Sequence, residues 1–497
     1  MALSKPAKAH FPHGSSPSPA LPSGVTLQAI DGETLPSSTT MSHNFYSRSG
    51  LSFAANRGVA GGMVAKSWDD PAFFPIGLWI PPILTSGDVT RWLDLGLNTA
   101  FGITSNSSNA LCLSAGFSVI VLQSELGLAF GLNAGAETVG LLSFDEPGDY
   151  PTGIGNPILN TANAVQDGRF WWVNNTWNEV TNIGSAGLPL NSTPSPGTVQ
   201  AQYFHLNPTP NAMTRHIDTQ SIDYYWMSGF GDSGVAGQAA ILTQIASIPA
   251  AQMCRAHFYG DMVDNTRQYQ AGFFPAPLPQ FVENGQPYTG SGTTPTAASY
   301  MTPPQLNAAV WATIIHGART LMYFNHTFGG AHITDDNLAD AYYQTVQTTL
   351  TDWGIQGGPN STTSIYAQTK ATNALVTSLA NVINSPFAMG LVTAVSPGPG
   401  WKFGDLITTA ALNQSGMDVM AKWDSLNFYI FALPRYGQSL TNQTATFTVT
   451  HVAGTTQVAV INESRTIGLT LNGGGAGLDT FSDTFADGNT VHIYKIN

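Results

Sequence analysis

The stretch V-G-L-L-S-F-D-E-P, residues 139–147, ends an apolar run with two adjacent carboxylates and a proline. Only 9% of the chain is charged, so the side-by-side placement of Asp145 and Glu146 is unusual in this sequence. A continuous apolar run of this kind is typical of a strand that is covered on both faces, as in a parallel sheet. The sequence therefore predicts a buried strand over 139–144 with carboxylates at its carboxyl end.

Seven further runs have the same apolar character and alternate with helical patterns. This alternation favours an α/β fold with a parallel sheet. Eight β/α units need roughly 250 residues or more, so residues 71–386 are predicted to form a (β/α)8 TIM barrel. The eight predicted strands are 73–80, 98–103, 117–123, 139–144, 169–175, 222–228, 279–285 and 319–326.

Helix signals lie between several of these strands. Thr85 or Ser86 can cap a helix that ends at Gly96, and a second helix is predicted around 108–115. Two later helices end at Gly317 and before the Ser385-Pro386 dipeptide. The apolar positions that define the first, third and fourth of these helices are Val89, Trp92 and Leu93, then Leu306, Val310, Thr313 and Ile314, then Leu375, Leu379, Val382 and Ile383.

The two ends of the chain differ from this middle part. Residues 1–70 are rich in Pro, Ser and Gly, and we expect an extended N-terminal arm that packs on a neighbour or stays mobile. Residues 387–497 contain short strands spaced by Gly, Asn and Asp turns, without a long amphipathic helix. This pattern predicts an antiparallel β-sandwich.

Composition excludes several classes of partner. The chain has 17 Lys and Arg against 30 Asp and Glu and no basic run, so neither nucleic acid nor a membrane surface is an expected partner. No apolar run is long enough to span a bilayer, and the start lacks the apolar stretch of a signal peptide. Two cysteines, Cys112 and Cys254, make no disulfide framework. We therefore expect a cytoplasmic protein or one that leaves the cell by a non-secretory route.

A second carboxylate is predicted at the same edge of the barrel as Asp145 and Glu146. Glu283, in F-V-E-N-G, lies near the carboxyl end of the seventh strand. Chemistry in these barrels is located at the carboxyl ends of the strands, so both acidic positions face one opening. A retaining glycosidase needs two carboxyl groups roughly 5 to 5.5 Å apart.

The D-E-P and E-N-G motifs and the terminal V-H-I-Y-K-I strand together resemble the large clan of retaining glycoside hydrolases with a β/α barrel. The resemblance covers roughly residues 73–497 and implies a carbohydrate substrate and no cofactor. It also implies that Glu146 is the acid/base and Glu283 the nucleophile. Asp145 departs from the commoner Asn of Asn-Glu-Pro; an aspartate accepts but does not donate a bond to a sugar hydroxyl, and it should raise the proton affinity of Glu146.

The resemblance also implies a tyrosine after strand six that touches the nucleophile. Tyr224 or Tyr225 is the candidate, since strand alternation sends only one of them inward. Aromatic side chains near strand ends can stack on sugars, although they are equally suited to a core. Together with Asp145, the remaining candidates for substrate binding are Trp79, Trp172, Trp177, Trp226, Asn325 and His326.

Other motifs favour simpler interpretations. The spacing of His326, His332, Asp335 and Asp336 fits no standard set of metal ligands, so a solvated loop is expected there and no metal site. The G-D-S-G stretch at 231–234 resembles the nucleophile loop of chymotrypsin-like proteases. It follows a strand of a β/α pattern in a chain without that family's disulfides, which argues against a protease.

A different class of function is also compatible with the composition. The Pro- and Ser-rich arm and the low-charge, Gly-, Thr- and Asn-rich chain resemble virion proteins. The alternative hypothesis is a non-catalytic minor tail protein of a bacteriophage that binds host-surface carbohydrate, with the arm contacting other tail proteins. Both hypotheses hold together if a tail enzyme trims a host cell-wall glycan.

Overall fold

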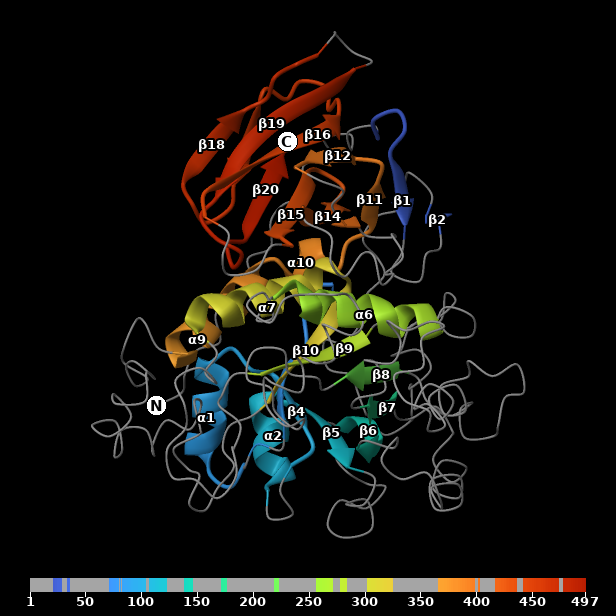
Figure 1. Ribbon diagram of the computed structural model, residues 1–497. Coiled ribbons are helices and arrows are strands. Elements are labelled where there is room, and N and C mark those ends of the chain that lie inside the picture. Colours follow the sequence, from blue (N-terminus) through green and yellow to red (C-terminus); the bar gives the residue numbers. More distant parts are fainter. Residues whose placement is uncertain are drawn as a thin grey trace, which may run out of the picture.

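The computed structural model describes part of the chain, and all structural statements below refer to that part. It consists of residues 21–28, 34–35, 71–79, 81, 83–103, 107–122, 138–145, 171–176, 219–222, 256–270, 278–283, 302–324, 365–397, 401–402, 416–435, 441–472 and 477–497. These residues form a mixed α/β fold with one parallel sheet, two largely antiparallel sheets, and helices between them (Figure 1).

The parallel sheet has eight strands in the order β8-β7-β6-β5-β4-β3-β10-β9, and each neighbouring pair is parallel. The two end strands of this order, β8 and β9, lie next to each other. The strands are β3 (Ile76–Trp79), β4 (Thr99–Phe101), β5 (Ser118–Leu122), β6 (Thr138–Asp145), β7 (Trp171–Thr176), β8 (Thr219–Ile222), β9 (Leu278–Glu283) and β10 (Ala318–Phe324). Each overlaps a predicted strand, but β8 begins three residues before the predicted start at 222.

Six helices lie in the described ranges, and the predicted helices coincide with five of them. They are α1 (Ser86–Asp94), α2 (Asn109–Ala115), α6 (His257–Gln270), α7 (Pro303–Ile315), α9 (Ile365–Ser378) and α10 (Ala380–Ile383). Thr85 caps α1 by accepting a hydrogen bond from the amide of Asp88, as predicted. Leu93 is 43% exposed, whereas Val89 and Trp92 are buried, so only the latter two form the apolar face.

The two faces of the parallel sheet have different neighbours. Ile76, Leu78 and Val282 belong to a hydrophobic cluster that includes Trp92 of α1 and Trp311 of α7. Because side chains alternate along a strand, residues 77, 79, 281 and 283 point to the opposite face. On that face a Cβ at Gly77 would lie 2.6 Å from Cδ2 of Phe101, so glycine is required there.

The C-terminal region contains a nine-stranded sheet in the order β18-β17-β20-β15-β14-β11-β1-β2, with β13 paired to β14, and a three-stranded sheet, β12-β16-β19. A second hydrophobic cluster joins the two sheets. Their strands are β11 (Phe387–Met389), β12 (Val392–Ser396), β13 (Trp401–Lys402), β14 (Met417–Trp423), β15 (Phe428–Pro434), β16 (Gln443–Thr450), β17 (Gln457–Val460), β18 (Arg465–Gly468), β19 (Leu478–Phe485) and β20 (His492–Ile496).

A short N-terminal segment completes the nine-stranded sheet. Strand β1 (Thr26–Gln28) pairs antiparallel with β11, and β2 (Thr34–Leu35) pairs with β1. Val25 and Leu27 are buried in the C-terminal cluster. This pairing, which the sequence did not predict, attaches the described part of residues 1–70 to the C-terminal region.

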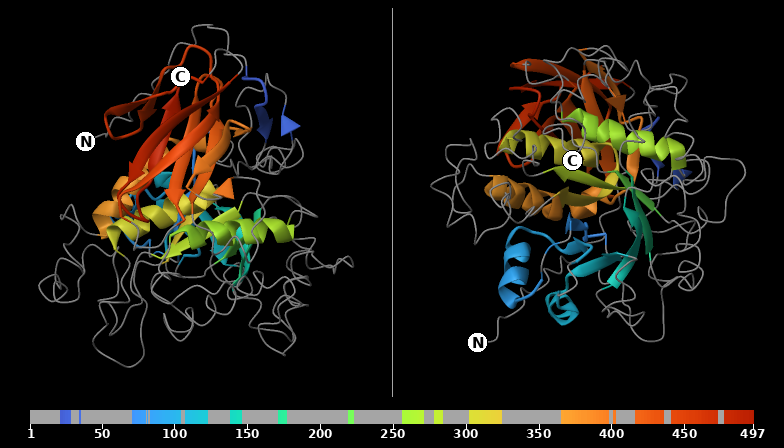
Figure 2. Two further views of the ribbon diagram at one scale, coloured as in Figure 1. Left: turned by 45° about the horizontal axis from the view of Figure 1, so that its top comes forward. Right: turned by 60° about the horizontal axis from the view of Figure 1, so that its bottom comes forward.

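Helices α6, α7, α9 and α10 form a layer between the parallel sheet and the C-terminal sheets (Figures 1 and 2). Trp311 of α7 stacks on Phe431 of β15 with ring centroids 5.8 Å apart. Strand β15 is buried at every position because this helix layer covers one face and the three-stranded sheet the other. None of the helices in the described ranges is long and apolar enough to cross a membrane.

Candidate active site

Glu283 is a buried carboxylate at the carboxyl end of a parallel strand. It is the last residue of β9, and its side chain is only 2% exposed. Val282 packs with the helix-facing cluster, so Glu283 and Phe281 point to the other face of the sheet. A charged side chain is rarely buried unless it has polar partners or a functional role.

Trp79, a residue predicted to bind sugar, lies on the same face of the sheet as Glu283. It is the last residue of β3, and its ring contacts that of Phe281 edge-on, with centroids 5.5 Å apart and an interplanar angle of 68°. Phe281 therefore connects a candidate sugar-stacking residue to the strand end that carries the candidate nucleophile.

Tyr259 contacts the candidate nucleophile, and the sequence analysis did not single it out. It lies in the first turn of α6, and its hydroxyl donates a hydrogen bond to Oε1 of Glu283. Both side chains are buried. The bond restricts the position of Oε1 of Glu283. The sequence gives no local signal for this contact, because α6 is separated from β8 by a long connection and its placement depends on tertiary packing.

The other candidate carboxylate position belongs to the same edge of the sheet. Strand β6 ends at Asp145, and in a parallel sheet the carboxyl ends of β6 and β9 lie at one edge. Trp172, by contrast, pairs with Leu141, and Asn175 is the partner of Asp145, so Trp172 lies three positions before that edge. The predicted site residues outside the described ranges are Glu146, Trp177, Tyr224, Tyr225, Trp226, Asn325 and His326.

Helix α6 also carries part of a buried ion network that links it to the C-terminal sheet. Arg435, directly after β15, donates from Nη2 to both carboxylate oxygens of Asp261, at 3.0 and 2.9 Å, and from Nη1 to Oδ1 of Asp418, at 2.5 Å. His316, the C-cap of α7, contacts Asp264 through Nδ1 at 2.5 Å and Asp418 through Nε2 at 3.2 Å. All five residues are buried.

Burial and charge both act on this network. Burial raises the pKa of Asp261 to about 7, although Arg435 and His316 act in the opposite direction. Burial would lower the pKa of His316, but Asp264 and Asp418 together raise it to about 9. Two cations, Arg435 and His316, therefore face three buried carboxyl groups.

No group of three or more His, Cys, Asp or Glu side chains in the described ranges is arranged to hold a metal ion. The four residues weighed as metal ligands from the sequence lie outside these ranges. The described side chains of the candidate site are a buried carboxylate, a phenol that donates to it, and the indole of Trp79, which contacts Phe281.

Similarity between this chain and known proteins is found at the level of structure. No family model matches it, and no curated protein matches its sequence. Among solved structures, a protein described as a glycoside hydrolase matches with a TM-score of 0.46 and 10% identity, over 85% of this chain and 92% of its own. The α-fucosidase of Thermotoga maritima in complex with fucose matches with a TM-score of 0.35 and 8% identity, over 84% of this chain and 79% of its own.

A plant β-glucan endohydrolase matches with a TM-score of 0.32 and 14% identity, over 53% of this chain and 94% of its own. The structural neighbours of this chain thus include glycoside hydrolases. Each of these TM-scores is below 0.5.

Proposed function

We propose that the protein is a retaining glycoside hydrolase in which Glu283 is the nucleophile and Glu146 the acid/base. The observation that carries the proposal is Glu283 itself, a buried carboxylate at the carboxyl end of β9 that accepts a hydrogen bond from Tyr259. The Trp79 ring on the same face of the sheet supplies an apolar surface of the kind on which a sugar stacks.

The proposal includes closure of the eight parallel strands into a barrel between β8 and β9, which lie side by side. Closure would set the ends of β6 and β9 across one opening. Glu146 directly follows the last residue of β6 and would then face Glu283. A separation of roughly 5 to 5.5 Å between the two carboxyl groups is what the retaining mechanism requires.

In this mechanism Glu283 attacks the anomeric carbon while Glu146 donates a proton to the leaving oxygen. Glu146 then removes a proton from the water that hydrolyses the glycosyl-enzyme. The bond from Tyr259 would hold the Glu283 carboxylate in the plane needed for attack, so that little reorganisation precedes the reaction. Asp145, next to Glu146, would favour the protonated form of its neighbour.

The first experiment measures hydrolysis of aryl glycosides that differ in sugar and anomeric configuration, and of cell-wall glycans. We expect Glu283→Gln and Glu146→Gln to lower kcat by a factor of about 10³ or more on aryl substrates that need acid assistance. Glu463→Gln is the matched control, because Glu463 lies in the C-terminal domain and is exposed. Full activity in Glu283→Gln would refute the proposal.

A second measurement separates the two roles. Azide is a nucleophile that needs no general base, so it should rescue Glu146→Ala by attacking the glycosyl-enzyme and give a glycosyl azide of retained configuration. In Glu283→Ala, azide should attack the substrate directly and give the inverted product. Proton NMR of the anomeric signal distinguishes the two. If glycans bind but no variant or wild-type protein releases product, the non-catalytic carbohydrate-binding virion protein is the remaining hypothesis.

A further inference from the structure

Three consecutive residues of α6 each contact a different part of the molecule. Tyr259 donates a hydrogen bond to Glu283 at the end of β9. Gly260 lies against the imidazole of His316, and Asp261 receives both Nη2 bonds of Arg435 from the C-terminal domain. The first turn of α6 therefore contacts the candidate nucleophile through Tyr259 and the C-terminal sheet through Asp261, only two residues further along the helix.

This turn has no room to shift on the side of α7. A Cβ at Gly260 would lie 2.2 Å from Cδ2 of His316 and 2.6 Å from Cγ, so the helix backbone is pressed against the ring. His316 is itself held by Asp264 and Asp418. A close-packed contact of this kind transmits displacement, because neither partner can yield without losing its own contacts.

On the other side, Arg435 holds the turn through an ion pair with fixed geometry. The guanidinium bonds Asp261 from Nη2 and Asp418 from Nη1, so it joins α6 to β14. All three side chains are at most 1% exposed. A planar fork of this kind specifies orientation in a way that a single point charge does not.

We propose that Arg435 and Asp261 are positioning residues that hold Tyr259 in hydrogen-bonding distance of Glu283, so that the C-terminal domain is part of the catalytic unit. The inference rests on the proposed function of Glu283. It goes beyond that function because it assigns a role in the site to Arg435, which belongs to the C-terminal region and contributes no reacting group.

The charged and titratable groups around Asp261 come from every element packed there. His257 of α6 lies 3.7 Å from Asp261 through Nε2, and Asp264 lies one turn further along the helix. His316 of α7 and Asp418 of β14 complete the set with Arg435. A variant at any of these groups alters the same network, so the test uses the two residues that join α6 directly to the C-terminal domain.

The experiment places 3-fluorotyrosine at position 259 of the full-length chain and records its fluorine NMR resonance. Glu283→Ala, which has no acceptor, defines the frequency of the broken hydrogen bond. We expect Arg435→Lys and Asp261→Asn to move the resonance at least about half of the way toward that frequency, because a lysine lacks the planar fork and an asparagine replaces one of the two accepting oxygens by an NH2 group that only donates. Arg465→Lys, which alters an arginine pair elsewhere in the C-terminal domain, should leave the resonance unchanged.

Kinetics supply the second readout. We expect Arg435→Lys to lower kcat about tenfold with KM changed by less than about twofold, since orientation at the reacting centre is lost but sugar contacts remain. In the Tyr259→Phe background the same substitution should have little further effect, because both changes act through one hydrogen bond. Additive losses in the double variant would contradict the inference.

The outcomes separate this inference from the proposed function. If the wild type hydrolyses no glycoside but the fluorine resonance moves as expected, the assigned activity fails and the mechanical link stands. If activity depends on Glu283 and the resonance is the same in Arg435→Lys, Asp261→Asn and wild type, the link is refuted. Should Arg435→Lys fail to fold, Asp261→Asn alone decides, since it preserves the shape of the side chain.

Discussion

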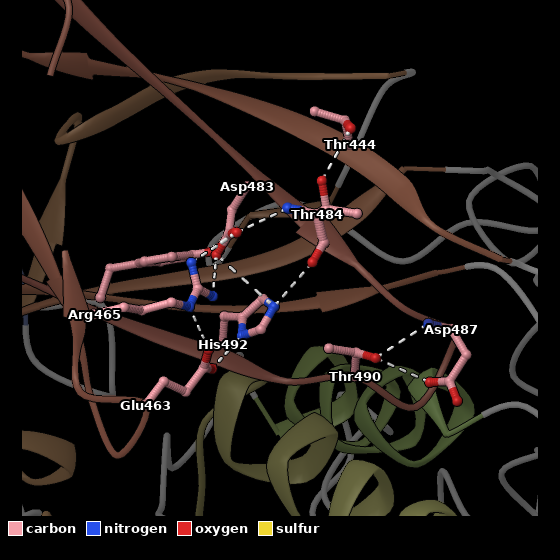
Figure 3. Close-up of polar contacts among 9 residues, drawn as sticks. Thr444, Glu463, Arg465, Asp483, Thr484, Asp487, Thr490 and His492 are labelled. Carbon is pink, nitrogen blue, oxygen red and sulfur yellow. Dashed lines mark hydrogen bonds and ion pairs between the residues drawn. The ribbon is translucent and has the colours of Figure 1, made fainter. Parts of the chain in front are cut away.

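Two arginine–carboxylate networks in the described part of the chain have similar composition but very different surroundings. Arg435 bonds both oxygens of Asp261 between the helix layer and the C-terminal sheet, and its side chain is 0% exposed. Arg465 bonds both oxygens of Asp483 and one oxygen of Glu463 within the C-terminal domain, and its side chain is 35% exposed (Figure 3). The same types of ion pair therefore occur once in a buried setting and once in a partly exposed one.

The two networks differ in how their aspartates titrate. Burial raises the pKa of Asp261 to about 7, which is above its ordinary value of 3.8. Burial also acts to raise the pKa of Asp483, but hydrogen bonds from Arg465 and the amide of Thr484 outweigh it and lower that pKa. Asp261 therefore stabilises the fold at low pH and loses this contribution as pH rises from 3.8 to 7, whereas Asp483 contributes above 3.8 and loses its contribution as pH falls.

The comparison teaches that an ion pair has no fixed effect on stability. In the Arg435 network, the cost of removing the charged groups from water opposes their attraction. The partners are needed mainly because a buried charge without a partner would destabilise the fold much more. In the Arg465 network, solvent screens the charges and each bond contributes little. His492 extends the latter network by contacting Glu463 and the carbonyl oxygen of Thr484.

The largest expected loss of stability comes from removing the charge of Arg435. Arg435→Met should lower the free energy of unfolding by about 3–5 kcal/mol, because Asp261 and Asp418 would remain buried without their cation. Urea unfolding followed by circular dichroism measures this loss. A cost below that of Arg465→Met would contradict the distinction between the two networks.

The pH dependence of Asp261→Asn gives the second test. At pH 4 to 7 the wild type should lose stability relative to the variant by up to about 1.4 kcal/mol per pH unit, since the folded protein holds a proton that the unfolded chain releases. His316, with a pKa raised to about 9, contributes a loss of the same sign between 6.5 and 9 in both proteins. Unfolding at a series of pH values measures the difference; parallel profiles would mean that Asp261 is ionised when folded.

The smallest effect is expected for Arg465→Met. The free energy of unfolding should fall by less than about 1 kcal/mol, because the arginine is partly solvated and Asp483 keeps the hydrogen bonds from the amide of Thr484 and the hydroxyl of Tyr494. Most of this difference should disappear in 1 M salt, where the screening length is about 3 Å. A loss of stability that persists in high salt would mean that the Arg465 pairs are not screened by solvent, and so do not differ from the Arg435 pairs in this respect.

Local features of the fold were predictable because their causes are local. The cap of α1 depends on Thr85 and Asp88, and α2 ends at Gly116 in the left-handed conformation, with φ of 73°. The parallel strands could be predicted because strands that are buried on both faces have continuous apolar sequences. The assignment of Leu93 to the apolar face of α1 was wrong, because a few apolar residues do not define the buried face of a helix accurately.

The candidate site was predictable only in part. The positions of Glu283 and Trp79 at strand ends were predictable, because strand ends can be located from apolar runs. Tyr259 was missed because its contact with Glu283 depends on where α6 packs. No period or spacing in the sequence relates an α6 residue to the end of β9.

The sequence by itself determined the alternation of parallel strands and helices, the change to antiparallel strands after Pro386, and the acidic residues at two strand ends. These follow from propensity and from the side-chain periods of strands and helices, which act over a few residues. Only the tertiary structure decided that Arg435 meets Asp261 and that Leu27 pairs with Ala388. Such contacts join segments far apart in the chain, and their free energy depends on what each side chain loses by leaving water, which only the packed fold specifies.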